Sequence, residues 1–128
     1  MSSIAHCLCG AIRLAFDRTR VSRPDICHCA SCRRATASPL TAGFALPDTA
    51  WRWTGRAPAS YVSSPGVTRE FCGTCGTQMA YRTDALPGET HFYIATLADP
   101  ASMAPERQAF ADEALPWTAG MLSLPRAD

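Results

Sequence analysis

The chain has 128 residues, a hydrophobic share of 47% and a formal net charge of +1. This length predicts a single domain over residues 1–128 with a modest core. All 12 basic residues are arginines, which excludes a P-loop and Schiff-base chemistry through lysine. The near-neutral charge, with no basic run longer than Arg33-Arg34, argues against a nucleic-acid partner.

Short strands dominate the predicted secondary structure. The candidate segments carry β-branched or aromatic residues, and Gly, Pro, Asp or Ser bounds most of them. They are residues 11–16, 41–46, 51–53, 60–62, 67–71, 78–82 and 91–97. We expect a turn at Pro24-Asp25, a short helical turn that begins with Pro100 after Asp99, and an irregular tail from Pro105 that wraps the body. This succession predicts a mainly β fold with little helix.

The cellular location is predicted from apolar patterning and from cysteine usage. No apolar run is long enough to span a membrane, and the opening residues MSSIAHCLCG lack the charged-then-apolar layout of a signal peptide. We therefore expect a cytoplasmic protein with no membrane partner. Seven cysteines in a reducing cytosol indicate metal ligation or reactive thiols rather than disulfides.

Two of the three cysteine groups together predict a closed metal site. The groups are Cys7-Leu-Cys9-Gly10, Cys27-His-Cys29-Ala-Ser-Cys32 and Cys72-Gly-Thr-Cys75-Gly76. The last has the spacing of a zinc knuckle, in which a glycine lets backbone N–H groups approach sulfur. This half-site needs a second pair of ligands, which Cys7 and Cys9 can supply. We predict a structural zinc on Cys7, Cys9, Cys72 and Cys75; ordinary buried or redox thiols are the alternative.

The remaining three cysteines, Cys27, Cys29 and Cys32, predict an open metal site. Three protein ligands with a free fourth position are how catalytic zinc sites are built. Such a zinc would favour a substrate thiol and lower its pKa. His28 is expected to point away, although it could complete a closed site of three cysteines and one histidine. A redox dithiol of Cys29 and Cys32 is another alternative, but the βαβ context of thioredoxin-like proteins is absent.

Arginines near the second cysteine group are candidates for binding substrate carboxylates. Arg33 and Arg34 follow Cys32 directly, and Arg69 is a further candidate, because guanidinium groups bind carboxylates in a bidentate manner. Solvent-facing arginines are the alternative. Trp51, Trp53 and Tyr61 can belong either to the core or to a partner surface, and alternation in strands favours the core.

The three cysteine groups, in this order, resemble the glutathione-dependent formaldehyde-activating enzyme (GFA) family, also called the centromere protein V/GFA domain. The resemblance lies in CLCGAIRL at 7–14, CHCASCRR at 27–34, TAGFAL at 41–46 and REFCGTCGTQM at 69–79, and more loosely in IATLADP at 94–100 and LPW at 115–117. It implies a β-tent fold of two twisted sheets held by zinc. It also implies two zinc ions per chain, a structural one on Cys7, Cys9, Cys72 and Cys75 and a catalytic one on Cys27, Cys29 and Cys32.

The family's reaction implies an activity for this chain. That reaction condenses glutathione with formaldehyde to S-hydroxymethylglutathione, which is formally a carbon–sulfur lyase working in reverse. Many relatives carry a histidine near the position of Gln108, and this chain lacks it. A non-catalytic zinc-stabilised binding module and a thiol-redox protein are the alternative functions.

Overall fold

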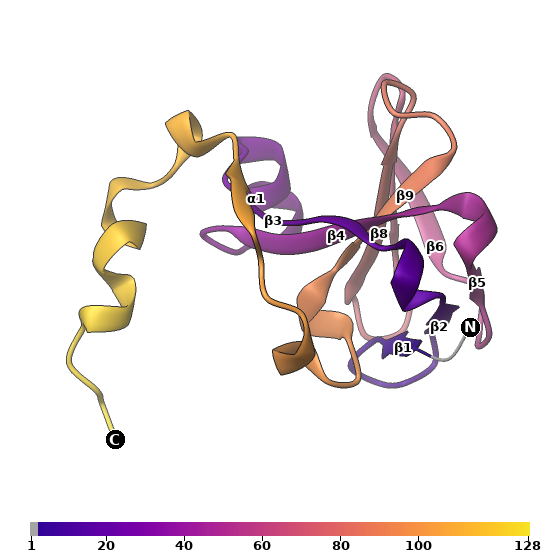
Figure 1. Ribbon diagram of the computed structural model, residues 1–128, viewed down its shortest axis with the longest axis horizontal. Helices are drawn as coiled ribbons and strands as arrows, with labels where there is room; N and C mark the ends of the chain where they lie inside the picture. Colours follow the sequence, from indigo (N-terminus) through magenta and orange to yellow (C-terminus); the bar gives the residue numbers. More distant parts are fainter. Residues whose placement is uncertain (1–2) are drawn as a thin grey trace.

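The computed structural model describes residues 3–128, which form a mainly β structure with one α-helix (Figure 1). The strands are β1 (Ser3–His6), β2 (Arg13–Phe16), β3 (Ser22–Cys27), β4 (Thr41–Pro47), β5 (Trp51–Trp53), β6 (Ala59–Ser64), β7 (Val67–Phe71), β8 (Gln78–Thr83), β9 (Glu89–Tyr93) and β10 (Arg107–Ala109). The helix is α1 (Ala30–Thr36), and six short 3-10 segments, η1 to η6, lie between or after the strands. No helix within residues 3–128 is long and apolar enough to cross a membrane. The predicted fold class is confirmed.

The strands form two sheets. The small sheet has the order β1-β2-β5, and the large sheet has the order β10-β3-β4-β9-β8-β7-β6. All pairs are antiparallel except β10 with β3. An isolated bridge between Ala5 and Leu97 adds a backbone contact between the end of the 3-10 segment η3 (Ile94–Thr96) and β1.

The main core lies between the two sheets. Phe16 of β2 packs on Phe44 of β4, with ring centroids 5.4 Å apart, and Phe44 packs on Phe92 of β9 at 5.8 Å. Trp51 and Trp53 pack against this cluster, which favours the core interpretation of both residues. The remaining aromatic candidate, Tyr61, is 61% exposed.

Alternation along the strands gives the large sheet two different faces. Phe44 and Ala80 point into the core, whereas their neighbours Gly43 and Tyr81 line a cavity on the opposite face. Successive side chains of a strand point to opposite sides, so one register serves both faces. The register that places Phe44 and Ala80 in the core therefore also places Gly43 and Tyr81 in the cavity lining.

Three predicted elements need correction. The expected turn at Pro24-Asp25 is wrong, because both residues lie inside β3. A register shift between Ser22 and Asp25 interrupts the pairing with β4, and such an irregularity accommodates a proline that cannot donate to the ladder. The strand expected over 91–97 ends at Tyr93 and continues as η3. The turn after Asp99 is present as η4 (Pro100–Ser102), but the Asp99 side chain does not cap it.

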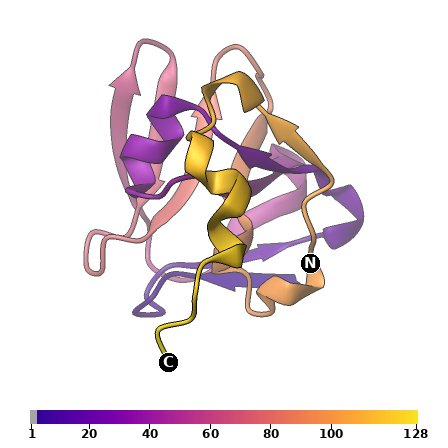
Figure 2. The same cartoon turned by 90° about the vertical axis from the view of Figure 1, so that its left-hand side faces the viewer.

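The tail follows the body over only part of its length. Strand β10 pairs with β3, and η5 (Ala111–Glu113) follows it. The last helical segment, η6 (Pro116–Ser123), has no buried residue. In Figure 1 this yellow segment stands to one side of the sheets, and Figure 2, viewed from that side, shows it in front of them. The expected wrapping is therefore wrong beyond η5, because the tail offers few apolar contacts to the body.

Candidate functional site

Four thiols from two distant segments form a compact group. Cys7 and Cys9 follow β1, and Cys72 and Cys75 lie in the turn after β7. Their four sulfur atoms lie within 4.8 Å of one another, and Cys9 Sγ is 3.6 Å from Cys7 Sγ and 3.7 Å from Cys72 Sγ. Four sulfurs bound tetrahedrally at about 2.3 Å from a zinc ion would be about 3.8 Å apart. The donor set and its spacing therefore fit a closed zinc site.

Backbone N–H groups surround this thiol group. The Ile12 N–H donates to Cys7 Sγ at 3.3 Å, and the N–H groups of Thr74 and Cys75 both donate to Cys72 Sγ at 3.4 Å. The N–H of Cys75 is the main cause that lowers the pKa of Cys72. These donors favour the thiolate form, which is the form that binds metal.

Gly76 shapes the zinc-knuckle turn through its backbone conformation. Its φ is +82°, and a Cβ added there would meet no atom within 4 Å. We expect Gly76→Ala to lower the unfolding free energy of the zinc-loaded protein by about 1–2 kcal/mol, the cost of a left-handed conformation. Denaturant unfolding measures this loss. Gly120→Ala is the matched control, because Gly120 is equally open but lacks a positive φ; equal losses in the two variants would refute the explanation.

The other three thiols gather where β3 meets α1. Cys27 ends β3, Cys29 is the N-cap of α1, and Cys32 lies in its first turn. Their sulfurs lie within 4.8 Å of one another, and the Cys32 N–H donates to Cys29 Sγ at 3.2 Å. The hydrogen bond with Cys27 holds the pKa of Cys32 below its usual value and raises that of Cys27. Three soft donors on one side of an ion fit a zinc site with a position left for another ligand.

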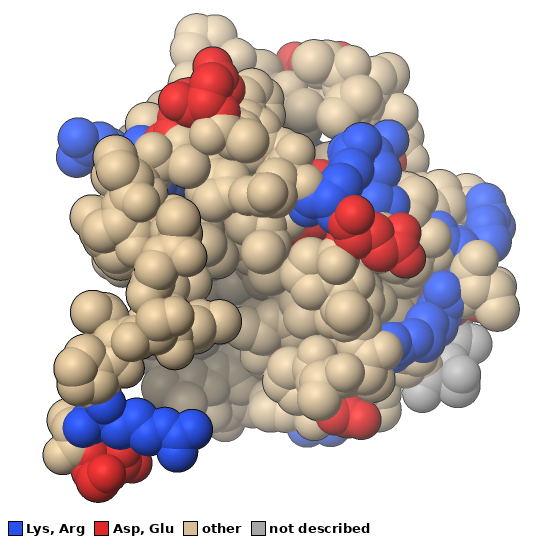
Figure 3. Space-filling model, turned by 60° about the vertical axis from the view of Figure 1, so that its left-hand side comes forward, with Lys and Arg blue, Asp and Glu red and all other residues tan. Residues whose placement is uncertain are grey.

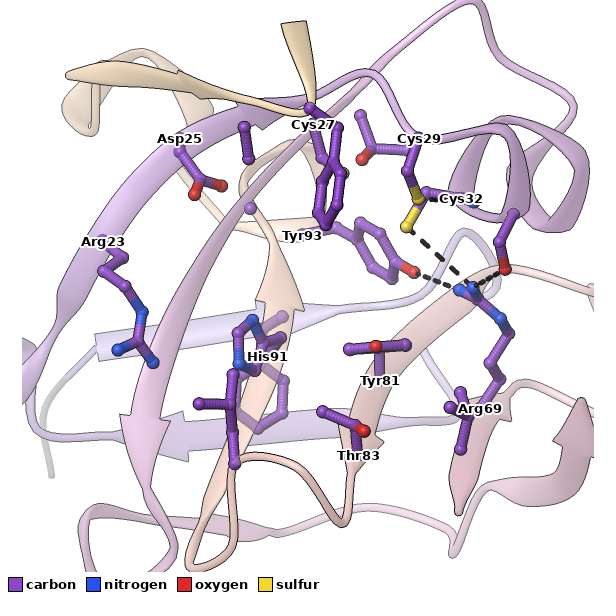
Figure 4. Close-up of a pocket in the computed structure, with 18 of the residues that line it drawn as sticks. Arg23, Asp25, Cys27, Cys29, Cys32, Arg69, Tyr81, Thr83, His91 and Tyr93 are labelled. Atoms are coloured by element: carbon purple, nitrogen blue, oxygen red, sulfur yellow. Dashed lines mark hydrogen bonds between the residues drawn. The ribbon is translucent and has the colours of Figure 1, made fainter. Parts of the chain in front are cut away.

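The three-thiol group opens into a cavity of about 540 Å³ (Figure 4). Its floor is one face of the large sheet, and Cys27, Cys29 and Cys32 stand at one end. Polar and aromatic residues from five strands line it: Arg23, Asp25, Arg69, Tyr81, His91, Tyr93 and Arg107. None of the cysteines of the four-thiol group is among the lining residues. The two thiol groups thus differ in their access to a ligand.

The arginines predicted to bind substrate take different positions. Arg69 lines the cavity, whereas Arg33 and Arg34 on α1 do not. Arg33 donates from Nε to the His28 carbonyl at 3.0 Å and from Nη2 to the Glu113 carbonyl at 3.3 Å. These bonds tie α1 to the start of the tail.

His28 lies apart from the sulfur atoms. It is 3% exposed, and its Nε2 is 2.8 Å from Oε1 of Gln108 on β10. It is not a member of the three-thiol group, in agreement with the expectation that it points away. Gln108 therefore has a structural partner where many relatives are expected to carry histidine.

Sequence reasoning missed Tyr81, His91 and Tyr93. Each occupies an alternate position of a predicted strand, so the strand period could have placed them on one face, but no motif marks them. Burial raises the pKa of Tyr93 to about 12 and lowers that of His91. At neutral pH the Tyr93 hydroxyl therefore keeps its proton and can donate it in a hydrogen bond.

Charged residues are dispersed on the surface that Figure 3 shows. Arginines and acidic residues lie among neutral residues over this face, and no continuous basic area crosses it. Nucleic-acid binding domains usually concentrate positive charge. This face gives no support to a nucleic-acid partner.

A mainly β fold with two sheets and two cysteine groups that could hold metal ions defines the class of this protein. The family described as glutathione-dependent formaldehyde-activating enzyme, GFA, matches residues 2–113, and the chain belongs to this family. The loosely similar LPW at 115–117 lies beyond the match.

One solved structure supports the fold. A crystal structure of a Rhodobacter sphaeroides protein is similar with a TM-score of 0.63 and 19% sequence identity, over 83% of this chain and 99% of that chain. No curated protein matches the sequence significantly. At 19% identity the structural likeness concerns the fold alone.

Proposed function

We propose that this protein is a zinc-dependent enzyme of the carbon–sulfur lyase type, which forms or breaks down the adduct of a thiol with a small carbonyl compound. Glutathione and formaldehyde are the proposed first substrates, from the family's description. The observation that carries the proposal is the opening of the three-thiol group into the cavity. A purely structural pair of zinc sites needs no such access.

The two thiol groups have different proposed roles. Cys7, Cys9, Cys72 and Cys75 would hold a structural zinc, and Cys27, Cys29 and Cys32 would hold a catalytic one. When bound at the second group, zinc would stabilise a thiolate at neutral pH. A reducing cytoplasm, the location predicted from the sequence, would keep all seven thiols available as ligands.

The cavity suits a ligand of modest size. Its volume lies within the usual range of small-molecule sites, about 300–1,000 Å³. Leu86 and Phe110 contribute apolar surface to its lining and would help to exclude water from the reacting atoms. Arg33 and Arg34, on the helix beside the thiols, remain proposed contacts for the carboxylates of a thiol such as glutathione.

Exchange measurements test the proposed activity directly. With glutathione and formaldehyde present, we expect the zinc-loaded protein to speed the exchange between free thiol and adduct by at least about tenfold over the spontaneous rate, as is typical of positioned catalysts. NMR exchange spectroscopy measures both rates in one sample. The control is an equal concentration of zinc salt without protein, and an unchanged rate with the protein would refute the proposal.

A further inference from the structure

Arg69 is a buried cation without a carboxylate partner. It is 4% exposed, and it is one of three arginines that line the cavity. The other two are paired, Arg23 with Glu89 and Arg107 with Asp25. Within residues 3–128, Arg69 makes no salt bridge. Arginine is almost never buried so deeply unless it is paired, so this position calls for negative charge on the thiols beside it or on a ligand.

The contacts of Arg69 leave part of its donor capacity unused (Figure 4). Its Nη2 donates to Ser31 Oγ at 2.9 Å, and its Nη1 donates to the Tyr93 hydroxyl oxygen at 3.5 Å. The guanidinium carbon lies 5.0 Å from the centre of the Tyr81 ring. Its Nε is buried and has no hydrogen-bond partner. All these neighbours are neutral, and Tyr93 accepts from Arg69 while its own proton remains free to donate.

The guanidinium also lies beside the thiols. Arg69 Nη2 is 3.9 Å from Cys32 Sγ, and Figure 4 shows dashed lines from the guanidinium to the Tyr93 hydroxyl and to the cysteine sulfur. Three thiolates and a divalent zinc ion would carry one net negative charge, which Arg69 would offset. A substrate thiolate would bring a second negative charge. Atoms bonded to that substrate sulfur would then lie within reach of Arg69 and Tyr93.

We propose that Arg69, together with the Tyr93 hydroxyl, binds the oxygen of the carbonyl carbon that becomes attached to the substrate sulfur. This proposal rests on the proposed function. During addition, the carbon–sulfur bond forms while the carbonyl π electrons move to oxygen. The resulting alkoxide takes up the proton that the substrate thiol lost, and breakdown of the adduct reverses both changes. Arg69 is then a catalytic residue, because donors aimed at a developing oxyanion stabilise the transition state.

A binding experiment tests the oxyanion site without turnover. The probes are mercaptoacetate and its neutral analogue mercaptoacetamide, titrated into cobalt-substituted protein, whose absorption reports thiol binding. We expect wild type to bind mercaptoacetate at least about tenfold more tightly than mercaptoacetamide, because charge-assisted hydrogen bonds to the carboxylate are stronger than those to the neutral amide. Arg69→Met should lose this preference, and Arg107→Met should keep it, because Arg107 lines the same cavity but is paired with Asp25. Equal affinities in wild type would overturn the proposal, whether or not the variants fold.

A rate experiment separates the reacting oxygen from a substrate carboxylate. Arg69→Met should reduce the acceleration of glutathione–formaldehyde exchange by about 10²–10³, the usual cost of removing an oxyanion donor. Its affinity for the neutral thiol 2-mercaptoethanol should fall less than its affinity for mercaptoacetate, because both thiolates lose the charge offset by Arg69 but only mercaptoacetate also loses a contact to an anionic oxygen. A lost mercaptoacetate preference with an unchanged rate would mean that Arg69 recognises a carboxylate, and it would overturn the proposed catalytic role.

The two experiments also distinguish this inference from the proposed function. If binding of mercaptoacetate is preferred and depends on Arg69, but the protein does not accelerate glutathione–formaldehyde exchange, the lyase activity is refuted and an anion-binding site at Arg69 is supported. Acceleration without that preference would overturn the role of Arg69 alone.

Discussion

Cys72→Ser should lose the proposed structural zinc and with it the stable fold. The four-thiol group joins residues 7–9, which connect β1 to β2 of the small sheet, to residues 72–75, which connect β7 to β8 of the large sheet. Structural zinc contributes folding free energy outright, and a core of this size has little to spare. Cys72 is buried at 1% exposure and accepts from the N–H groups of Thr74 and Cys75, which a serine could also accept, so the expected loss comes from the lost metal ligand. We expect a loss of more than about 3 kcal/mol of unfolding free energy.

Zinc content and thermal unfolding measure this effect together. Protein purified anaerobically without chelators should contain two zinc ions per chain as wild type and at most about one as Cys72→Ser. The thermal unfolding transition of Cys72→Ser should broaden or shift to a much lower temperature than that of wild type. The matched control is the same substitution in the other thiol group, Cys29→Ser. A Cys72→Ser protein that keeps its zinc and unfolds like wild type would refute the structural role of the four-thiol group.

Cys29→Ser should abolish activity while the fold survives. Removing one of three ligands should reduce zinc from two per chain to about one and lower the acceleration of adduct exchange by at least about 10², because the thiolate is no longer stabilised. The fold should survive because Cys29 is the N-cap of α1, where its sulfur accepts from the Cys32 N–H, and serine is a favoured residue at this position. The circular dichroism spectrum and the unfolding midpoint should remain near wild type.

The same variant separates the alternative functions. If Cys29→Ser loses stability or partner binding and wild type has no exchange activity, the protein is a zinc-stabilised binding module. A single zinc in both wild type and variant would show that the three thiols do not hold a stable metal, and a reversible Cys29–Cys32 disulfide would then support a redox role. Two zinc ions in the variant, with full activity, would contradict the division into four and three ligands.

Local sequence determined most of the strands, though not β1, β3 and β10, and the composition of the two thiol groups. Alternation marked β4, β5, β7 and β8, because the period of two depends only on neighbouring residues. Ligand counting sorted the seven cysteines into four and three, and the structure brings the same sets together. Residue type and spacing were sufficient here, because the cysteines occur in three short segments, and the four-thiol group needs two of these segments while the three-thiol group needs one.

Local reasoning was wrong where tertiary contacts outweigh local preference. The Pro24-Asp25 dipeptide favours a turn, yet pairing with β4 and β10 holds it in a strand. Strand β10 is only three residues long and owes its assignment to β3. Helix α1 was not predicted, because its first turn reads as a cysteine motif and is capped by one of those cysteines.

The tertiary structure decided which side chains line the cavity. Sheet register places Arg69 opposite Tyr81 and Tyr81 opposite His91, and it places Tyr93 opposite Gly43. Gly43 is far from the other four in the chain, and no motif or spacing signals that these residues meet. Arg33 and Arg34, which adjoin Cys32 in the sequence, do not line the cavity, whereas Arg69 does. The sequence by itself specifies which cysteines belong to each of the two thiol groups. Pairing between strands decides which other side chains face the three-thiol group, because that pairing depends on the whole sheet.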